Sequence, residues 1–314
     1  MKVFVAGATG AIGKQLLPIL VDRGHEVTGM TRSRAKQDAI RAMGARPVVA
    51  DGLDPEGVAQ AVAEAEPEAV IHELTDLTGT FARNIDKAFA TTNRLRTEGT
   101  DHLLTAARAV GARRFIAQSF AGWPFKRVGG EVKSEEDPLD DSPPKPIRQT
   151  LAAIRHLEDT VTDADGIDGL ALRYGGFYGP GTSLALNPPG QLTEMIRKRR
   201  FPVVGSGAGI WSMVHIQDAA SATAAALERG EPGLYNVVDD EPTPVSTFVT
   251  EVASVIGAKP PRHVPLWLGR LLGGEAGAIM MTEIRGASNT KAKRELGWEL
   301  RYPSWRLGLR EKAG

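Results

Sequence analysis

The feature that most constrains the fold is a glycine-rich turn near the amino terminus. The segment Gly7 to Gly13, GATGAIG, follows the apolar run Val3 to Ala6 and opens a segment of helical periodicity with Ile12, Leu16, Leu17 and Leu20 on one face. The first glycine of such a turn permits a tight bend, the second lets the backbone approach a pyrophosphate, and the third allows close helix-strand packing. The helix amino terminus stabilises the anion. We therefore predict a dinucleotide site with contacts from Gly7, Thr9, Gly10, Ala11, Ile12 and Gly13.

Apolar runs alternate with helix-length segments through the first half of the chain. The expected strands are Val3 to Ala6, Glu26 to Met30, Pro47 to Val49, Ala69 to His72, Arg114 to Gln118, and Gly169 to Arg173. Helices are expected between them, including Ile12 to Arg23, Val58 to Ala65 and Thr91 to Val110. Continuous apolar strands that alternate with helices are typical of a parallel sheet covered on both faces. The sequence predicts a Rossmann-type, doubly wound α/β fold.

The pattern becomes less regular after the sixth predicted strand. Residues Tyr178 to Gly209 are rich in proline and glycine and contain the basic run Arg197 to Arg200, which either grips a substrate phosphate or is a solvated helix end. Two more strands are expected at Val214 to Ile216 and Leu234 to Val238. We predict a dinucleotide-binding core at residues 1 to 177, to which 212 to 239 return, and a smaller substrate lobe at 178 to 211 and 240 to 314.

An acidic, proline-rich segment interrupts the predicted core. Residues Glu131 to Pro146 read EVKSEEDPLDDSPPKP and are expected to form an exposed loop. Such a loop either covers a binding site or is a solvated connector. The residues alone leave both alternatives open.

Composition narrows the classes of function. Lysine plus arginine equals aspartate plus glutamate at 38 each, so no net charge attracts nucleic acid or acidic membranes. Cysteine is absent, which excludes disulfides and thiolate catalysis. No apolar run is long enough to span a bilayer and no secretion signal is recognisable. We expect a cytoplasmic protein with a small-molecule substrate and no bound metal, and a homodimer as a possible assembly.

The end of the second strand favours a phosphorylated dinucleotide. The strand ends Met30-Thr31-Arg32-Ser33-Arg34, where a carboxylate would bind the ribose hydroxyl of NAD. The two guanidinium groups of Arg32 and Arg34 instead suit a 2'-phosphate, so NADP(H) is preferred over NAD(H). The alternative is that both arginines are solvated. Adenine contacts are expected after the third strand, at Asp51, Gly52 and Leu53.

Several motifs together resemble the extended short-chain dehydrogenase/reductases, which include sugar-nucleotide epimerases and dehydratases. Besides the glycine turn, the chain has Val70-Ile71-His72, Thr92-Asn93 with Glu98-Gly99-Thr100, Leu172 to Gly181 (LRYGGFYGPG), Val214 to Ala220 (VHIQDAA), Leu234-Tyr235-Asn236-Val237, and Asn289 to Ala292 with Leu296-Gly297-Trp298. The resemblance covers most of the chain and implies an NAD(P)-dependent oxidoreductase. It also implies cofactor contacts at Leu74, Asn93, Gln118, Tyr174 and Gly175.

The catalytic signature of that family is missing. The resemblance implies a tyrosine and, four residues later, a lysine that lowers the tyrosine pKa and holds the nicotinamide ribose. These positions are Thr150 and Ile154, and no Tyr-x-x-x-Lys occurs anywhere in the chain. The hydroxyl position after the fifth strand falls on Phe120, beside Ser119. Helical spacing from Leu151 offers a structural explanation, in which Ile154 belongs to a packed stripe.

The remaining candidates suggest an apolar substrate site. The polar groups proposed for catalysis are Ser119, Thr150 and Tyr178, and the predicted pocket residues are Phe120, Trp123, Ile154, Phe177 and Trp211. The aromatic residues either line a pocket for a hydrophobic carbonyl or enone compound or pack in the core. The leading hypothesis is a reductase with a non-standard proton donor. The alternatives are a non-redox isomerase or lyase that retains NADP, and a catalytically silent NADP-binding sensor.

Overall fold

The computed structural model describes residues 1–77 and 84–311. A seven-stranded sheet in which all the strands are parallel forms the centre of the molecule. Its order is β12 (Gly233–Val237), β7 (Asp168–Tyr174), β5 (Arg114–Phe120), β4 (Ala69–His72), β1 (Lys2–Ala6), β2 (Glu26–Thr31) and β3 (Arg46–Val49). The order runs outward from β1 in both directions. The predicted doubly wound fold is thus confirmed.

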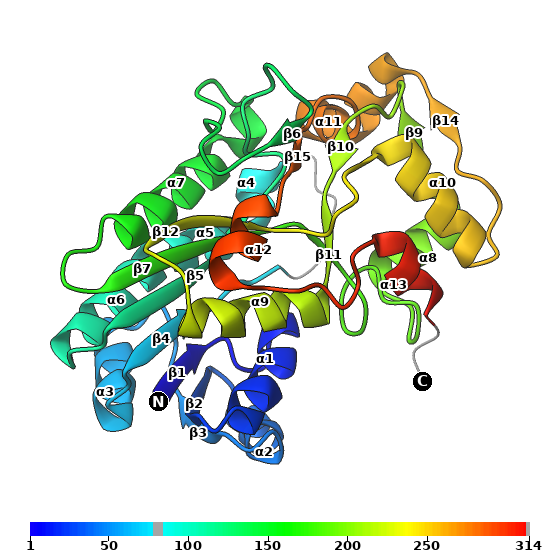
Figure 1. Ribbon diagram of the computed structural model, residues 1–314. Helices are drawn as coiled ribbons and strands as arrows, with labels where there is room; N and C mark the ends of the chain where they lie inside the picture. Colours follow the sequence, from blue (N-terminus) through cyan, green and yellow to red (C-terminus); the bar gives the residue numbers. More distant parts are fainter. Residues whose placement is uncertain (78–83, 312–314) are drawn as a thin grey trace.

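Helices cover both faces of the sheet, as Figure 1 shows. Val3 and Val5 of β1 pack with α1 (Ala11–Asp22) and α9 (Ile216–Glu228), and α2 (Gln37–Ala42) adds Ile40 to the same core cluster. Phe4 faces the other side, where its cluster includes residues from α3 (Pro55–Ala65), α6 (Glu98–Ala109) and α7 (Arg148–Thr162). Adjacent strand residues point to opposite faces, so two apolar cores sandwich the sheet.

The predicted continuous helix Thr91 to Val110 is wrong. Two helices replace it, α5 (Ala90–Arg96) and α6, and α4 (Ile85–Ala88) precedes them. Thr97 separates α5 from α6 with φ −97° and ψ −86°. Its hydroxyl donates to the carbonyl oxygens of Asn93 at 3.1 Å and Arg94 at 3.3 Å. Local bonds of this kind compete with regular helix geometry, which periodicity alone does not register.

A second group of elements lies beside the sheet (Figure 1). It comprises β8 (Gly176–Tyr178), α8 (Gln191–Arg197), β9 (Val203–Val204), β10 (Ile210–Trp211), β11 (Met213–His215), β13 (Thr243–Pro244), α10 (Val245–Val255), β14 (His263–Val264), α11 (Leu266–Thr282) and α13 (Trp305–Arg310). Its core contains Phe201, Phe248 and Trp305. We call this group the small lobe. The exact division of the chain into domains stays a prediction.

The acidic segment is only partly the exposed loop that its composition predicts. It contains β6 (Val132–Lys133), which pairs with β15 (Gly286–Ala287) ahead of α12 (Thr290–Leu296), and the short helix η2 (Lys145–Ile147). Asp140 is buried and receives the Arg127 guanidinium at 2.6 Å. Paired charges allow acidic residues to be buried, so composition overstates the exposure of this segment.

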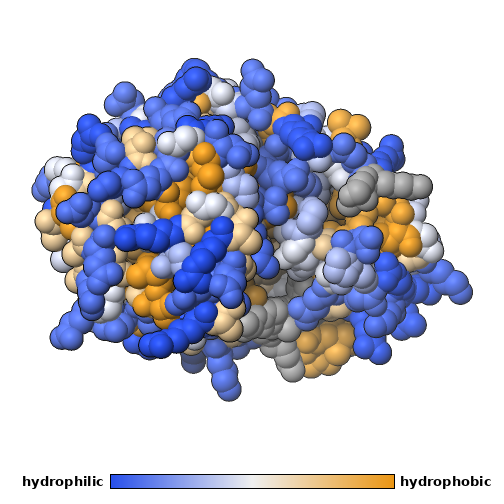
Figure 2. All heavy atoms as spheres, turned by 90° about the horizontal axis from the view of Figure 1, so that it is seen from below, coloured by the Kyte–Doolittle hydropathy of each residue, from blue (hydrophilic) through white to orange (hydrophobic). Residues whose placement is uncertain are grey.

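Hydrophilic residues predominate on the face that Figure 2 shows, where apolar residues form separate patches among them. Within the described residues, no helix has the length and apolar character needed to cross a membrane.

Candidate cofactor and substrate site

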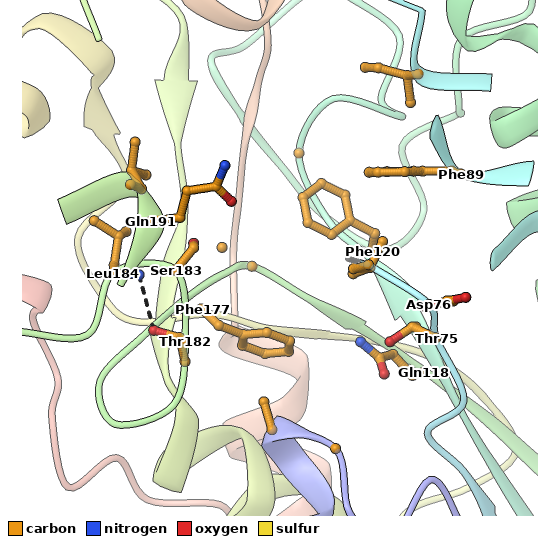
Figure 3. A pocket seen from close by; sticks show the side chains of 18 of the residues that line it. Thr75, Asp76, Phe89, Gln118, Phe120, Phe177, Thr182, Ser183, Leu184 and Gln191 are labelled. Atoms are coloured by element: carbon orange, nitrogen blue, oxygen red, sulfur yellow. Dashed lines mark hydrogen bonds between the residues drawn. The ribbon is translucent and has the colours of Figure 1, made fainter. Parts of the chain in front are cut away.

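A cavity of about 1240 Å³ extends from the glycine-rich turn to the small lobe. Small-molecule sites commonly occupy about 300–1,000 Å³, so this cavity has room for a dinucleotide and a second molecule. Figure 3 shows Phe120, Phe177 and Phe89 at its wall, with Ser183 and Gln191 contributed from the small-lobe side. The two ends of the cavity therefore differ in origin, one from the sheet and one from the lobe.

The glycine turn has the close packing that a pyrophosphate site requires. Gly7 has φ +98°, and a Cβ on this residue would lie 2.6 Å from the Glu73 carbonyl oxygen. A Cβ on Gly13 would lie 2.5 Å from the Gly7 carbonyl oxygen. Gly10 caps α1 without a side-chain hydrogen bond, so the helix amino terminus stays open to an anion. These residues fit a dinucleotide, and Thr9, Ala11 and Ile12 also line the cavity.

Basic and polar residues line the cavity where the second and third strands end. Arg32, Ser33 and Lys36 lie there together with Asp51 and Gly52. The Arg32 guanidinium is 3.6 Å from a carboxylate oxygen of Asp76. Two predicted contacts, Arg34 and Leu53, do not line the cavity. Lys36 was not predicted, although it belongs to the same basic segment as Arg32.

The cofactor contacts predicted between residues 74 and 175 divide into two groups. Leu74, Gln118 and Gly175 line the cavity, whereas Asn93 and Tyr174 do not. The Asn93 amide donates to the Thr150 hydroxyl at 3.1 Å. The Tyr174 hydroxyl donates to Glu73 at 3.1 Å. The Tyr174 hydroxyl is thus engaged within the protein, whereas Asn93 Oδ1 is buried without a hydrogen-bond partner among the described residues. Both predicted cofactor contacts stay predictions.

Ser119 lies at the cavity and is tied to a buried ion pair. Its hydroxyl donates to Glu158 at 2.5 Å. Both oxygens of Glu158 receive the Arg173 guanidinium, at 2.8 Å and 2.6 Å. Because the Ser119 hydroxyl donates its proton to this carboxylate, the hydroxyl oxygen can only accept a hydrogen bond from a ligand. A catalytic role for Ser119 stays a prediction.

Thr150 and Tyr178 lie away from the cavity, which argues against their predicted catalytic roles. Thr150 is fully buried, and its backbone amide and hydroxyl donate to Asp86 at 2.8 Å and 2.7 Å. Tyr178 is also fully buried, and its ring packs on that of His215 with 5.1 Å between centroids. Burial raises the Tyr178 pKa well above its ordinary value. Neither hydroxyl is available to a substrate in this arrangement.

Four of the five residues predicted for the substrate pocket line the cavity, and all four are aromatic. Phe120, Trp123, Phe177 and Trp211 line it, as does Phe89, which was not predicted. Ile154 does not line it and packs in an apolar core cluster, so the structural explanation of that residue holds. Arg199 and Arg200 reach the cavity, whereas Arg197, paired with Glu194, does not. An apolar cavity with aromatic walls results.

Two buried ionisable residues at the cavity were missed by sequence reasoning. Burial raises the pKa of Glu73 to about 8. Burial lowers the pKa of Arg96 to about 10, with the Glu158 charge opposing the shift. The sequence signal that could have indicated a buried Glu73 is its position directly after a strand of four apolar or aromatic residues. For Arg96 the sequence offered none beyond its place in a helical segment.

Comparison with known proteins gives the family. The NAD dependent epimerase/dehydratase family matches residues 3–237. The chain belongs to this family. A 3-diazoavenalumate denitrifying reductase from Streptomyces sp is 44% identical over 311 residues, covering 98% of this chain and 99% of that protein. A 2-alkyl-3-oxoalkanoate reductase from Stenotrophomonas maltophilia (strain K279a) is 28% identical, covering 82% of this chain and 76% of that protein.

A solved structure shares the fold. The UDP-glucose 4-epimerase from Thermotoga maritima has a TM-score of 0.77 at 22% identity, with 99% of this chain and 96% of that chain covered. The family and its named reductases identify the chain as an NAD(P)-dependent oxidoreductase of the extended short-chain dehydrogenase/reductase type. The predicted family and enzyme class are confirmed, and a redox function is favoured over the isomerase, lyase and sensor alternatives.

Proposed function

We propose that the protein is an NADP(H)-dependent reductase of an aromatic substrate. The observation that carries this proposal is the continuity of the glycine turn with an aromatic-walled cavity. When bound, the nicotinamide cofactor supplies hydride. Phe120, Trp123 and Phe177 would hold the flat aromatic ring of the substrate by ring contacts and exclude water from it.

Preference for NADP(H) rests on local charge. Arg32 and Lys36 are cationic and Ser33 has a hydroxyl donor, and all three line the cavity after the second strand. Guanidinium and ammonium groups bind phosphate oxygens strongly. Asp76 competes for Arg32 at 3.6 Å, a distance too long for a direct hydrogen bond. These charges favour a 2'-phosphate over a bare ribose.

The nature of the hydride acceptor follows from the missing acid. Among the described residues that line the cavity, there is neither a tyrosine nor a histidine. An arene with a diazonium group needs no acid, because hydride replaces dinitrogen: a C–H bond forms, the C–N bond breaks, and N₂ leaves with the bonding electrons. The named activity of the Streptomyces relative supports this substrate class. We infer a diazo-substituted aromatic compound as the substrate.

A second candidate is reduction of a carbonyl or enone group, which does require a proton. Glu73 lines the cavity, and a pKa raised to about 8 by burial keeps its carboxyl group protonated at neutral pH. The named activity of the Stenotrophomonas relative favours this class. Glu73 would then take the place of the missing tyrosine as the acid.

Stopped-flow absorbance of enzyme-bound NADPH separates the candidates. The enzyme is mixed with a diazonium derivative of 4-hydroxycinnamate and, separately, with a panel of aromatic ketones and enones. We expect NADPH oxidation with the diazonium compound and release of one N₂ for each NADPH. Oxidation by the ketones alone would favour the second candidate, and no oxidation by either class would overturn the proposed function.

A further inference from the structure

The guanidinium group of Arg96 is a buried cation in the wall of the cavity. Arg96 ends α5, is 5% exposed, and belongs to the cavity wall. Its Nε and Nη1 atoms are buried and have no hydrogen-bond partner in the described part of the chain. Buried polar groups in folded proteins are nearly always hydrogen-bonded, and buried charges are nearly always paired. An exception of this kind at a cavity points to a ligand.

The carboxylate that influences Arg96 is already occupied. The negative charge of Glu158 acts on Arg96. However, both Glu158 oxygens bind the Arg173 guanidinium, and one also accepts the Ser119 hydroxyl. The three buried charged groups Arg96, Arg173 and Glu158 therefore carry one net positive charge. An anionic group in the cavity would balance it.

Two polar side chains that flank Arg96 in the sequence bind α7 instead. Asn93 of α5 contacts Thr150 of α7 at 3.1 Å, and Asp101 of α6 contacts His156 of α7 at 2.8 Å. The remaining acceptor of Asn93, its Oδ1, is buried and forms no hydrogen bond with Arg96 among the described residues. Because Arg96 belongs to the cavity wall, its free donors are placed to bind a ligand in the cavity.

We propose that Arg96 binds an oxyanion group of a ligand, either the carboxylate of the aromatic substrate or a phosphate of the cofactor. A guanidinium group presents paired donors that match the oxygens of both groups. The carboxylate is the expected source, because the glycine turn, Arg32 and Lys36 already supply the cofactor phosphates with donors. The assignment of the oxyanion to a substrate carboxylate rests on the proposed function. The proposal that Arg96 binds an oxyanion does not depend on it.

Binding measurements on three variants test this site. Arg96→Met removes the charge, Arg96→Lys keeps it, and Arg108→Met removes an exposed arginine from α6 that does not line the cavity. Each protein is titrated calorimetrically with 4-hydroxycinnamate, its methyl ester, NADPH and 2',5'-ADP. We expect wild type to bind the carboxylate at least about tenfold more tightly than the ester. Arg96→Met should abolish this difference, Arg96→Lys should retain part of it, and Arg108→Met should match wild type.

The titrations also identify the source of the oxyanion. Weaker NADPH binding by Arg96→Met, with unchanged discrimination between carboxylate and ester, would support the site with the cofactor as its ligand. Unchanged 2',5'-ADP binding would then place the contact outside the adenosine half. If Arg96→Met binds all four probes like wild type, the inference is overturned.

Thermal unfolding without ligand excludes a merely structural role. An uncompensated buried charge destabilises a fold, so Arg96→Met should have a Tm no lower than wild type. A marked loss of Tm, with no selective loss of one probe, would overturn the inference in favour of a structural role. Because binding is measured without turnover, failure of the proposed reduction and failure of this site are distinguishable.

Discussion

At the scale of single residues, the Glu158–Arg173 pair is the most consequential contact beside the cavity. The two side chains are 4% and 3% exposed. Glu158→Gln should therefore lower the free energy of unfolding by about 3–5 kcal/mol, because it leaves the Arg173 charge buried and unpaired. Denaturant unfolding measures the loss. Glu98→Gln, which breaks the exposed pair with Arg94, is the control and should change little. Equal losses in the two variants would contradict this account.

Glu73 makes stability depend on pH. Its pKa rises from an ordinary value of 4.5 to about 8 on folding, chiefly because burial disfavours the carboxylate. The folded state therefore holds a proton that the unfolded state releases, and stability falls as pH rises between these two pKa values. Across that window the free energy of unfolding should fall by about 1.4 kcal/mol for each pH unit. Glu73→Gln should flatten the decline in denaturant unfolding measured from pH 5 to pH 8.

A second buried acid provides the control for Glu73. The pKa of Asp239 is also raised to about 8 by burial, and Asp239 does not line the cavity. Asp239→Asn should flatten the pH dependence in the same direction without changing NADPH binding. If the free energy of unfolding fell more steeply with rising pH in either variant than in wild type, the predicted direction of the pH dependence would be wrong.

The choice of cofactor should depend on Arg32 and Lys36. Replacing both by alanine removes the cations proposed to bind the 2'-phosphate. NADPH affinity should fall about tenfold or more, since charge-assisted hydrogen bonds contribute about 1.5–3 kcal/mol each. NADH affinity should stay the same. Fluorescence titration with the two cofactors checks this, and an equal loss for both would argue against a 2'-phosphate contact.

At the scale of elements, the turn between β1 and α1 tolerates no added side chain. Gly13→Ala would place a Cβ 2.5 Å from the Gly7 carbonyl oxygen and 2.6 Å from that of Ala8. Backbone atoms cannot move away cheaply, so this variant should lose NADPH binding and unfold at a lower temperature. Gly99→Ala is the matched control within α6, because its Cβ would have no contact closer than 3.6 Å. It should bind NADPH like wild type.

Elements were predictable where local periodicity determines them. Each of the six strands predicted for the core agrees with the structure to within two residues at either end, because continuous apolar runs mark buried parallel strands. Helix α7 shows that periodicity does not predict contacts between distant segments. Periodicity correctly suggested a packed Ile154, but it could not show that Thr150 turns towards Asp86. That partner lies 64 residues earlier in the chain, on α4.

At the scale of the whole molecule, the cavity is formed by segments that lie far apart in the sequence. The glycine turn, the aromatic residues after β5 and Trp211 of the small lobe meet in it. Motifs predicted most of these segments. The burial of the ionisable groups of Glu73 and Arg96 was not predictable, because desolvation depends on packing among β4, α5 and α7 and leaves no local pattern.

The assembly of the molecule stays a prediction. Helix α11 exposes Trp267, Leu271 and Leu272 by 67%, 60% and 61%. Exposed apolar side chains of this size are typical of interaction surfaces. The predicted homodimer is consistent with them, and sedimentation velocity measures whether it forms.

The central claim is that hydride passes from NADPH to an aromatic substrate without a tyrosine acid. Single-turnover reaction with NADPH deuterated at the transferable position, in ordinary water and in D₂O, tests it most directly. We expect a slower reaction with the deuterated cofactor, deuterium on the former diazo-bearing carbon, and no further slowing of hydride transfer in D₂O. NADPH that stays reduced, or a product whose new hydrogen comes from water, would contradict it.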